Sequence, residues 1–113
     1  MSMRAGKYRH RVLVEEPIPS QNETGEEIIE WRSHGRIWAS VDPASGREQF
    51  LAAMISANTD TLICCRWSPL IDRLRAKWRL SHRGTIYDVQ NVRHVNMARE
   101  EVEIQANSGR NNG

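Results

Sequence analysis

The feature that most constrains this sequence is an alternation of apolar and polar residues with a period of two, which is interrupted once. Such alternation is typical of β-strands that turn one face toward a core. It predicts about six strands joined by short links. We expect them over residues 9–15, 26–31 with a continuation or restart over 36–41, 59–67, 76–82, 85–95 and 100–106.

The interruption follows Pro43 and has the period of a helix. Ser45 and Glu48 form a capping-box pattern, in which each side chain can bind a free amide of the first turn. Apolar residues then recur four apart, as in Phe50 and Met54, so one stripe is hydrophobic. We predict one helix over 46–57. It either plugs an open end of the barrel, or projects to contact a neighbouring subunit or to line a channel.

Turn residues divide the rest of the chain. Pro17 and Pro19 predict the end of the first strand, and the polar stretch 20–25 a loop. Residues 70–74 are predicted as a short connector, such as a single helical turn, and Arg83-Gly84 as a tight hairpin. The fold class is therefore mainly β: a small antiparallel six-stranded barrel, SH3-like, with one inserted short α-helix. We expect a single domain over 1–106 and a disordered polar tail over 107–113.

The charge balance disfavours a dedicated binder of duplex DNA. Sixteen basic residues against fourteen acidic ones give a net charge of only +2, whereas such binders concentrate positive charge to neutralise many phosphates. Acidic residues crowd the first third of the chain and basic residues the middle. This segregation suits contacts between neighbouring subunits, and it also fits ordinary solvated faces. No apolar run is long enough to span a membrane and we find no signal peptide, so we expect assembly in the cytosol.

We find no constellation of catalytic, cofactor-binding or metal-ligating residues, and we predict that the protein is not an enzyme. Cys64 and Cys65 are adjacent and point to opposite faces of a strand, so we expect one buried thiol and one partly exposed thiol. Four tryptophans are many for this length. They would fill the core or a subunit interface, or stack nucleic acid bases as in small barrels that bind single strands.

Three segments in register resemble the phage head-tail adaptor family, whose members are also called head-tail joining or stopper proteins. They are residues 6–12 (GKYRHRV), 38–43 (WASVDP) followed by 45–48 (SGRE), and 83–89 (RGTIYDV). The resemblance runs from about residue 4 to 106. The paired cysteines and the Trp67-Ser68-Pro69 turn depart from the family pattern.

The resemblance implies a structural phage or prophage protein, located in the virion. It would form a homo-oligomeric ring, close the DNA-filled head below the portal and its adaptor, and present a docking surface for the tail. Expected partners are portal, adaptor and tail proteins, further copies of this chain, and packaged DNA in passing, with no cofactor and no membrane. The isolated chain would be a monomer if ring formation needs a template.

Two sets of residues follow as candidates. The resemblance maps a channel-facing, DNA-retaining loop onto Arg47, Glu48 and Gln49. Candidates for subunit or partner contacts are Trp38, Phe50, Arg66, Arg73 and Arg75. Alternative functions are a tail terminator or tail completion ring, and a small β-barrel that binds nucleic acid.

Overall fold

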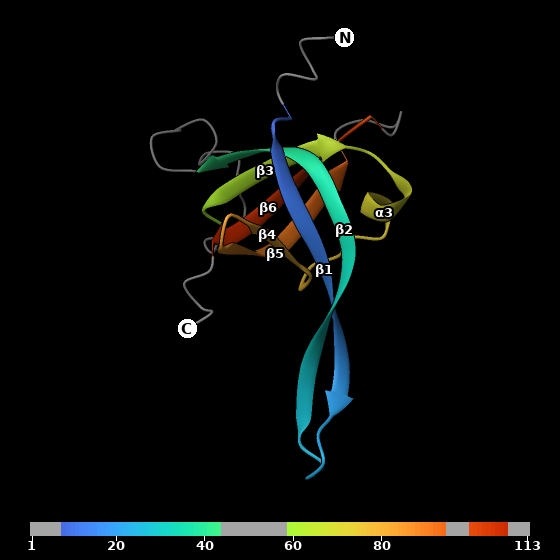
Figure 1. Ribbon diagram of the computed structural model, residues 1–113. Helices are drawn as coiled ribbons and strands as arrows, with labels where there is room; N and C mark the ends of the chain where they lie inside the picture. Colours follow the sequence, from blue (N-terminus) through green and yellow to red (C-terminus); the bar gives the residue numbers. More distant parts are fainter. Residues whose placement is uncertain (1–7, 44–58, 95–99, 109–113) are drawn as a thin grey trace.

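The computed structural model describes residues 8–43, 59–94 and 100–108. They form six strands and one short helix (Figure 1). The elements are β1 (His10–Gln21), β2 (Glu27–Pro43), β3 (Thr61–Arg66), α3 (Pro69–Asp72), β4 (Arg79–His82), β5 (Thr85–His94) and β6 (Glu101–Ser108). The predicted helix over 46–57 lies outside the described residues.

The six strands close into a barrel in the order β1-β2-β3-β6-β5-β4, and all neighbours are antiparallel. Pairing of β1 with β4, from Leu13 opposite Ser81 to Glu15 opposite Arg79, completes the ring of strands. The predicted mainly β, antiparallel, six-stranded fold is confirmed. Closure pairs the strand edges that an open sheet of this size would expose.

All six strands contribute inward side chains to one core, which explains the period of two. Ile63 of β3 lies opposite Ile104 of β6, and both are fully buried. Ile71 of α3 and Leu74 just after it extend the same core. The other buried members are Val12, Val14, Ala39, Cys65, Trp78, Leu80, Val89, Val102 and Ala106.

Two strands continue well beyond the barrel as a twisted ribbon, which we call the arm (residues 16–33; Figure 1). The described pairing of β1 with β4 stops at Glu15, and that of β2 with β3 begins at Ala39. Within the arm, the two strands pair with each other as far as Gln21 and Glu27. The register of β1 shifts between Leu13 and Glu15, where the strand leaves the barrel. The arm makes the molecule 51 Å long against 29 and 27 Å in the other directions.

The prediction that Pro17 and Pro19 end the first strand is wrong, because β1 runs through both. Their nitrogen atoms point to the same side of the strand, since the residues are two apart. Pairing with β2 continues past both, so that side faces away from β2, where a proline removes no ladder hydrogen bond. Of the two possibilities left open for residues 36–41, continuation is right and a break at Gly35 is wrong. β2 is one strand of 17 residues, and Gly35 takes a φ of +104° within it.

Other boundaries agree more closely. Residues 69–72 form the single helical turn expected near there, with Ser68 as N-cap and its hydroxyl accepting from the Ile71 amide at 3.2 Å. Arg83 and Gly84 turn the β4–β5 hairpin with φ of +53° and +84°. β6 extends two residues past the predicted end, into the expected tail. The Ser108 amide and hydroxyl bind the Asp60 carboxylate there, at 2.8 and 2.9 Å.

Candidate functional site

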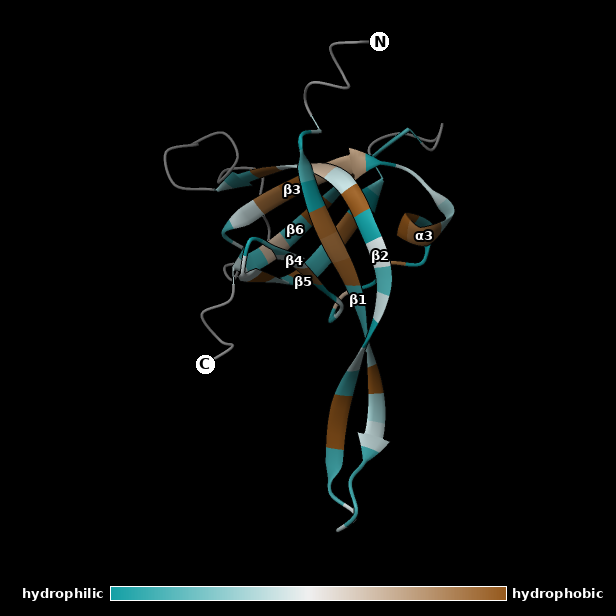
Figure 2. Ribbon diagram, in the orientation of Figure 1, coloured by the Kyte–Doolittle hydropathy of each residue, from teal (hydrophilic) through white to brown (hydrophobic). Residues whose placement is uncertain are grey.

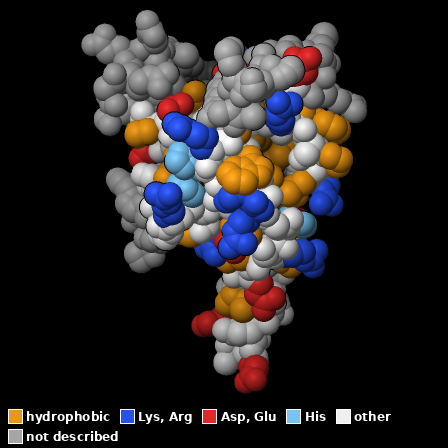
Figure 3. All heavy atoms as spheres, turned by 45° about the horizontal axis from the view of Figure 1, so that its top comes forward, with side chains coloured by type: hydrophobic (Ala, Val, Ile, Leu, Met, Phe, Trp, Pro, Cys, Tyr) orange, Lys and Arg blue, Asp and Glu red, His pale blue; other side chains and the backbone are white. Residues whose placement is uncertain are grey.

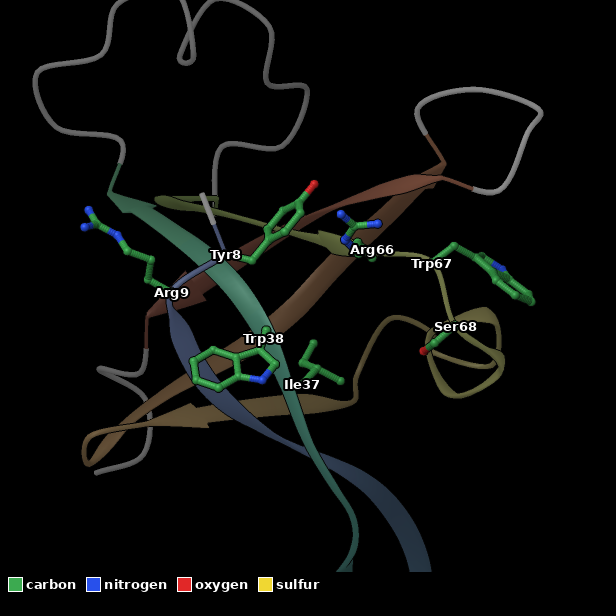
Figure 4. Close-up of a pocket in the computed structure, with 7 residues that line it drawn as sticks. All are labelled: Tyr8, Arg9, Ile37, Trp38, Arg66, Trp67 and Ser68. Carbon is green, nitrogen blue, oxygen red and sulfur yellow. The ribbon is translucent and has the colours of Figure 1, made fainter. Parts of the chain in front are cut away.

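The barrel surface carries a groove of about 590 Å³ lined mainly by aromatic and basic side chains (Figure 4). Residues from three parts of the chain meet there: the segment entering β1, the middle of β2, and the end of β3 with the residues that follow it. We call it the aromatic groove; its lining is Tyr8, Arg9, Ile37, Trp38, Arg66, Trp67 and Ser68.

Trp38 is the most exposed aromatic side chain of the groove. Its neighbour Ala39 is fully buried, so the alternation of β2 turns Trp38 outward, and 54% of its surface is exposed. The guanidinium of Arg11, opposite it on β1, lies 4.8 Å from the ring centroid. This cation–π contact helps to hold the orientation of the indole, which stays more than half exposed.

The other aromatic groups of the groove are held by hydrogen bonds to carboxylates. The Tyr8 hydroxyl donates to Glu101 at 2.7 Å, and Trp67 Nε1 donates to Asp72 at 3.0 Å. The Arg66 guanidinium lies 5.9 Å from the Tyr8 ring centroid. The groove is thus a preformed surface whose lining includes two arginines, Arg9 and Arg66, and no carboxylate.

The arm has the opposite charge and carries its own apolar side chains. Residues 18–31 include four glutamates and no basic residue. Ile28 and Ile29 lie among them, with 37% and 58% of their surface exposed. Figure 2 shows hydrophobic stretches on both strands of the arm, and Figure 3 shows acidic side chains on the arm and basic ones around a hydrophobic group on the barrel. The two surfaces are complementary in charge and alike in apolar character.

The apolar residues of the arm follow from its register. Pro19 pairs with Ile29 and Pro17 with Trp31, and cross-strand partners share a face of the ribbon. At the tip, Asn22 Oδ1 accepts from the amides of Thr24 and Glu26, both at 3.0 Å. This turn chemistry gives the arm a defined end.

Contacts at the base of the arm set its direction. Arg79 of β4 donates to Glu15 at 2.7 Å, and its guanidinium lies 4.1 Å from the centroid of the Trp31 ring. His34 Nε2 lies 2.8 Å from a Glu16 carboxylate oxygen, and its ring stacks on Trp78 with centroids 5.4 Å apart. These contacts tie the arm to the barrel and leave its tip exposed.

The structure brings together two of the predicted contact residues and separates others. Trp38 and Arg66 both line the groove, while Arg73 and Arg75 follow α3, are exposed and are absent from that lining. The Arg75 guanidinium binds the carbonyls of Asp72 and Leu74 at 3.1 and 3.0 Å. Four candidates lie outside the described residues: Arg47, Glu48, Gln49 and Phe50.

Sequence reasoning missed the arm and most of the groove. The clue to the arm was two isoleucines among closely spaced glutamates, flanked by prolines two residues apart. Tyr8 and Trp67 both line the groove although they are far apart in the sequence, and no local spacing predicts that they share one surface.

Reactive groups are scarce in the described part of the chain. No cluster of three metal-ligating side chains occurs there, and none of its helices could cross a bilayer. Both cysteines are buried and neither forms a disulfide, so the prediction of one partly exposed thiol is wrong. Cys64 faces away from the core, but neighbouring groups cover it to 6% exposure. Burial, followed by the nearby Cys64 and Glu101, raises the pKa of Cys65 to about 12, which makes it a poor nucleophile at neutral pH.

Two solved structures share this fold. One is the solution structure of a protein from Shigella flexneri 2a, with a TM-score of 0.70 and 21% identity, covering 94% of this chain and 96% of that one. The other comes from the virion of a native gene transfer agent particle, with a TM-score of 0.59 and 21% identity, covering 85% and 90%. No curated protein matches the sequence.

The sequence matches the phage head completion protein family over residues 3–109, almost the whole chain. This range includes the three segments on which the resemblance was predicted, together with the aromatic groove and the arm. The chain belongs to the phage head completion protein family.

Proposed function

We propose that this protein forms a ring that closes the DNA-filled head below the portal and offers the tail its docking surface. Membership of the family makes it a structural component of the virion with a role in head completion. The ring, the position below the portal and the contact with the tail are the proposal.

The observation that carries the proposal is that each molecule exposes two surfaces of opposite charge, the aromatic groove and the tip of the arm. The aromatic groove is apolar and basic, and the tip of the arm is apolar and acidic. A closed ring of identical subunits needs two different patches on each subunit, which meet in a heterologous contact. A neutral globule with one patch would favour a two-fold dimer instead.

The charge of the chain fits a connector through which DNA passes. A net charge of +2 gives little non-specific affinity for phosphates, so DNA could move past the ring. The alternative function, nucleic acid binding through stacked tryptophans, has less support. Trp78 is buried and Trp31 is covered by Arg79, which leaves no continuous platform of indoles.

Within this proposal, Trp38 and Arg66 contact a neighbouring subunit or partner protein through the groove. Arg73 is an exposed candidate for a separate partner contact, whereas Arg75 is engaged with backbone carbonyls. Phe50 remains a candidate for the subunit contact. Arg47, Glu48 and Gln49 remain the candidates for the channel-facing loop.

The proposal is tested by mixing the purified chain with the portal and adaptor assembly of the same phage. Negative-stain microscopy should show an additional ring stacked below the adaptor. A chain that bound isolated tails but left portal assemblies bare would instead be a tail terminator or tail completion protein. Gel shifts with short single- and double-stranded DNA at physiological salt should show little binding, and tight salt-sensitive binding would favour the nucleic acid alternative.

A further inference from the structure

We propose that the tip of the arm of one copy of this chain seats in the aromatic groove of the next copy. This inference rests on the proposed ring and specifies the contact that holds it together. It assigns a ligand to the groove: an acidic, isoleucine-bearing β-ribbon, supplied by residues 18–31 of the neighbouring subunit.

Within one chain, the arm cannot reach its own groove. Arg9 lies in the groove just before β1, and the tip of the arm begins at Asn22, just after β1 ends. A strand rises about 3.3 Å per residue, so these thirteen steps span roughly 40 Å. Arg79 and His34 fix the base of the arm, and Figure 1 shows the ribbon pointing away from the barrel. The ligand must therefore come from a second copy.

The apolar parts of the two surfaces match. Ile28 and Ile29 are exposed on a ribbon that has no layer packed over its end, and the remaining large exposed hydrophobic side chain of the described residues is Trp38. The groove has the size of a binding pocket, with aromatic walls and a few polar groups. Because Ile28 and Ile29 are consecutive in β2, they point to opposite faces of the ribbon. Seating the face that carries Ile29 against Trp38 would remove both of these side chains from water together.

The charges select this pairing and its direction. The four glutamates of residues 18–31 would approach Arg9 and Arg66 in the groove, with Arg11 beside them on Trp38. Two carboxylates in contact with groove residues, Glu101 and Asp72, already accept hydrogen bonds from Tyr8 and Trp67. Two grooves, or two arm tips, would instead bring like charges together. Each copy thus uses its arm once and its groove once, which is the arrangement that closes by rotation.

The test is a disulfide between two single-cysteine variants of the full chain. Chains carrying Ile29→Cys and chains carrying Trp38→Cys are mixed at high concentration, alone and with the portal and adaptor assembly, and oxidised. The native Cys64 and Cys65 are buried and do not compete. We expect a cross-linked dimer that contains one chain of each kind.

The matched control replaces Asn91 of β5, which is exposed and on the wall of the barrel opposite β2. Asn91→Cys should not cross-link to Ile29→Cys under the same conditions. In a second measurement, Arg66→Glu should weaken self-association about tenfold or more, and pairing it with chains that carry Glu27→Arg and Glu30→Arg should restore it.

The outcomes separate this inference from the proposed function. Stacked rings on the portal without the 29–38 cross-link would overturn the arm-in-groove contact and leave the ring intact. If Trp38→Ala abolished attachment to the portal and no 29–38 cross-link formed, the groove would bind another virion protein, which also overturns the inference. Absence of any self-association, with or without the portal, would overturn both.

Discussion

Ile104 and Ile29 have the same side chain in opposite surroundings. Ile104 is fully buried opposite Ile63 in the barrel core, whereas Ile29 is 58% exposed on the arm. We predict that Ile104→Ala lowers the free energy of unfolding by about 2–5 kcal/mol, because it removes buried methyl groups and leaves a cavity. Ile29→Ala should change it by no more than about 0.5 kcal/mol. Urea unfolding followed by tryptophan fluorescence measures both, and equal effects would contradict the assigned core.

Cys65 should make the protein less stable in alkali. Its folded pKa is about 12, above the ordinary value of 9.0, because burial disfavours the thiolate. Between these two values the unfolded chain gives up the thiol proton while the folded chain keeps it, so this residue lowers stability as pH rises. Below pH 9 both states keep the proton, and the effect vanishes.

The expected size is a slope of up to about 1.4 kcal/mol per pH unit in that window. Other groups also titrate there, so the measurement compares urea unfolding of the wild type and Cys65→Ala at several pH values. Between pH 9 and 12, Cys65→Ala should lose less unfolding free energy per pH unit than the wild type does. Parallel curves would show that Cys65 ionises as readily in the folded chain as in the unfolded one.

At the scale of residues, the sequence predicted well which side chains of a strand point into the core. It predicted less well which side chains on the outer face are covered by neighbouring groups. Trp78 and Leu80 alternate with polar residues and are buried, as expected. Cys64 was predicted to be partly exposed because it lies on the face opposite Cys65. It is buried because groups outside the core cover that face, and such coverage depends on contacts that no strand pattern contains.

At the scale of elements, Arg79 of β4 provides a side-chain link between the barrel and the arm. Its guanidinium binds Glu15, which is 14% exposed, and covers Trp31. We predict that Arg79→Met costs about 1–3 kcal/mol of stability, because it leaves a largely buried carboxylate without its partner and uncovers the indole. The loss should be accompanied by faster backbone motion over residues 16–33, measured by ¹⁵N relaxation.

Arg79→Lys is the matched control for this prediction. It keeps the positive charge but loses the planar group that stacks and binds in a fork, so its effect should lie between wild type and Arg79→Met. If Arg79→Met left both stability and arm motion unchanged, the base of the arm would be held by other contacts, such as that of His34 with Glu16.

The elements differ in how much local sequence determines them. The β4–β5 hairpin was predictable, because Arg83-Gly84 supplies the positive φ that a two-residue turn requires. The arm was not, because prolines and a central glycine are ordinarily signs of a break. They are tolerated because β1 has a free outer edge past the barrel and Gly35 takes a φ of +104°. Whether a proline nitrogen faces a partner or solvent depends on pairing, which a single strand does not disclose.

At the scale of the whole molecule, folding and assembly should be separable. The arm can be shortened by replacing the whole segment 19–29 with the dipeptide Asn-Gly. Ile18 and Glu30 are paired across the ribbon, so a two-residue turn can join them. The barrel core contains no residue from this segment, so unfolding free energy should change by no more than about 0.5 kcal/mol. Self-association and ring formation on the portal should be lost.

The measurement combines urea unfolding with sedimentation of the mixture of chain and portal assembly. A shortened chain that unfolded much earlier would show that the arm supports the barrel. A stable shortened chain that still formed rings would show that the arm has no part in assembly.

The two prolines of the arm also bear on whether other strands can pair with its outer edge. A long exposed ribbon is a template on which other chains can polymerise edge to edge, as in amyloid. Pro17 and Pro19 offer no amide hydrogen along the outer edge of β1, so a foreign strand finds too few donors there. The two prolines that make the arm hard to predict from the sequence thus also disfavour edge-to-edge pairing of this ribbon with a foreign strand.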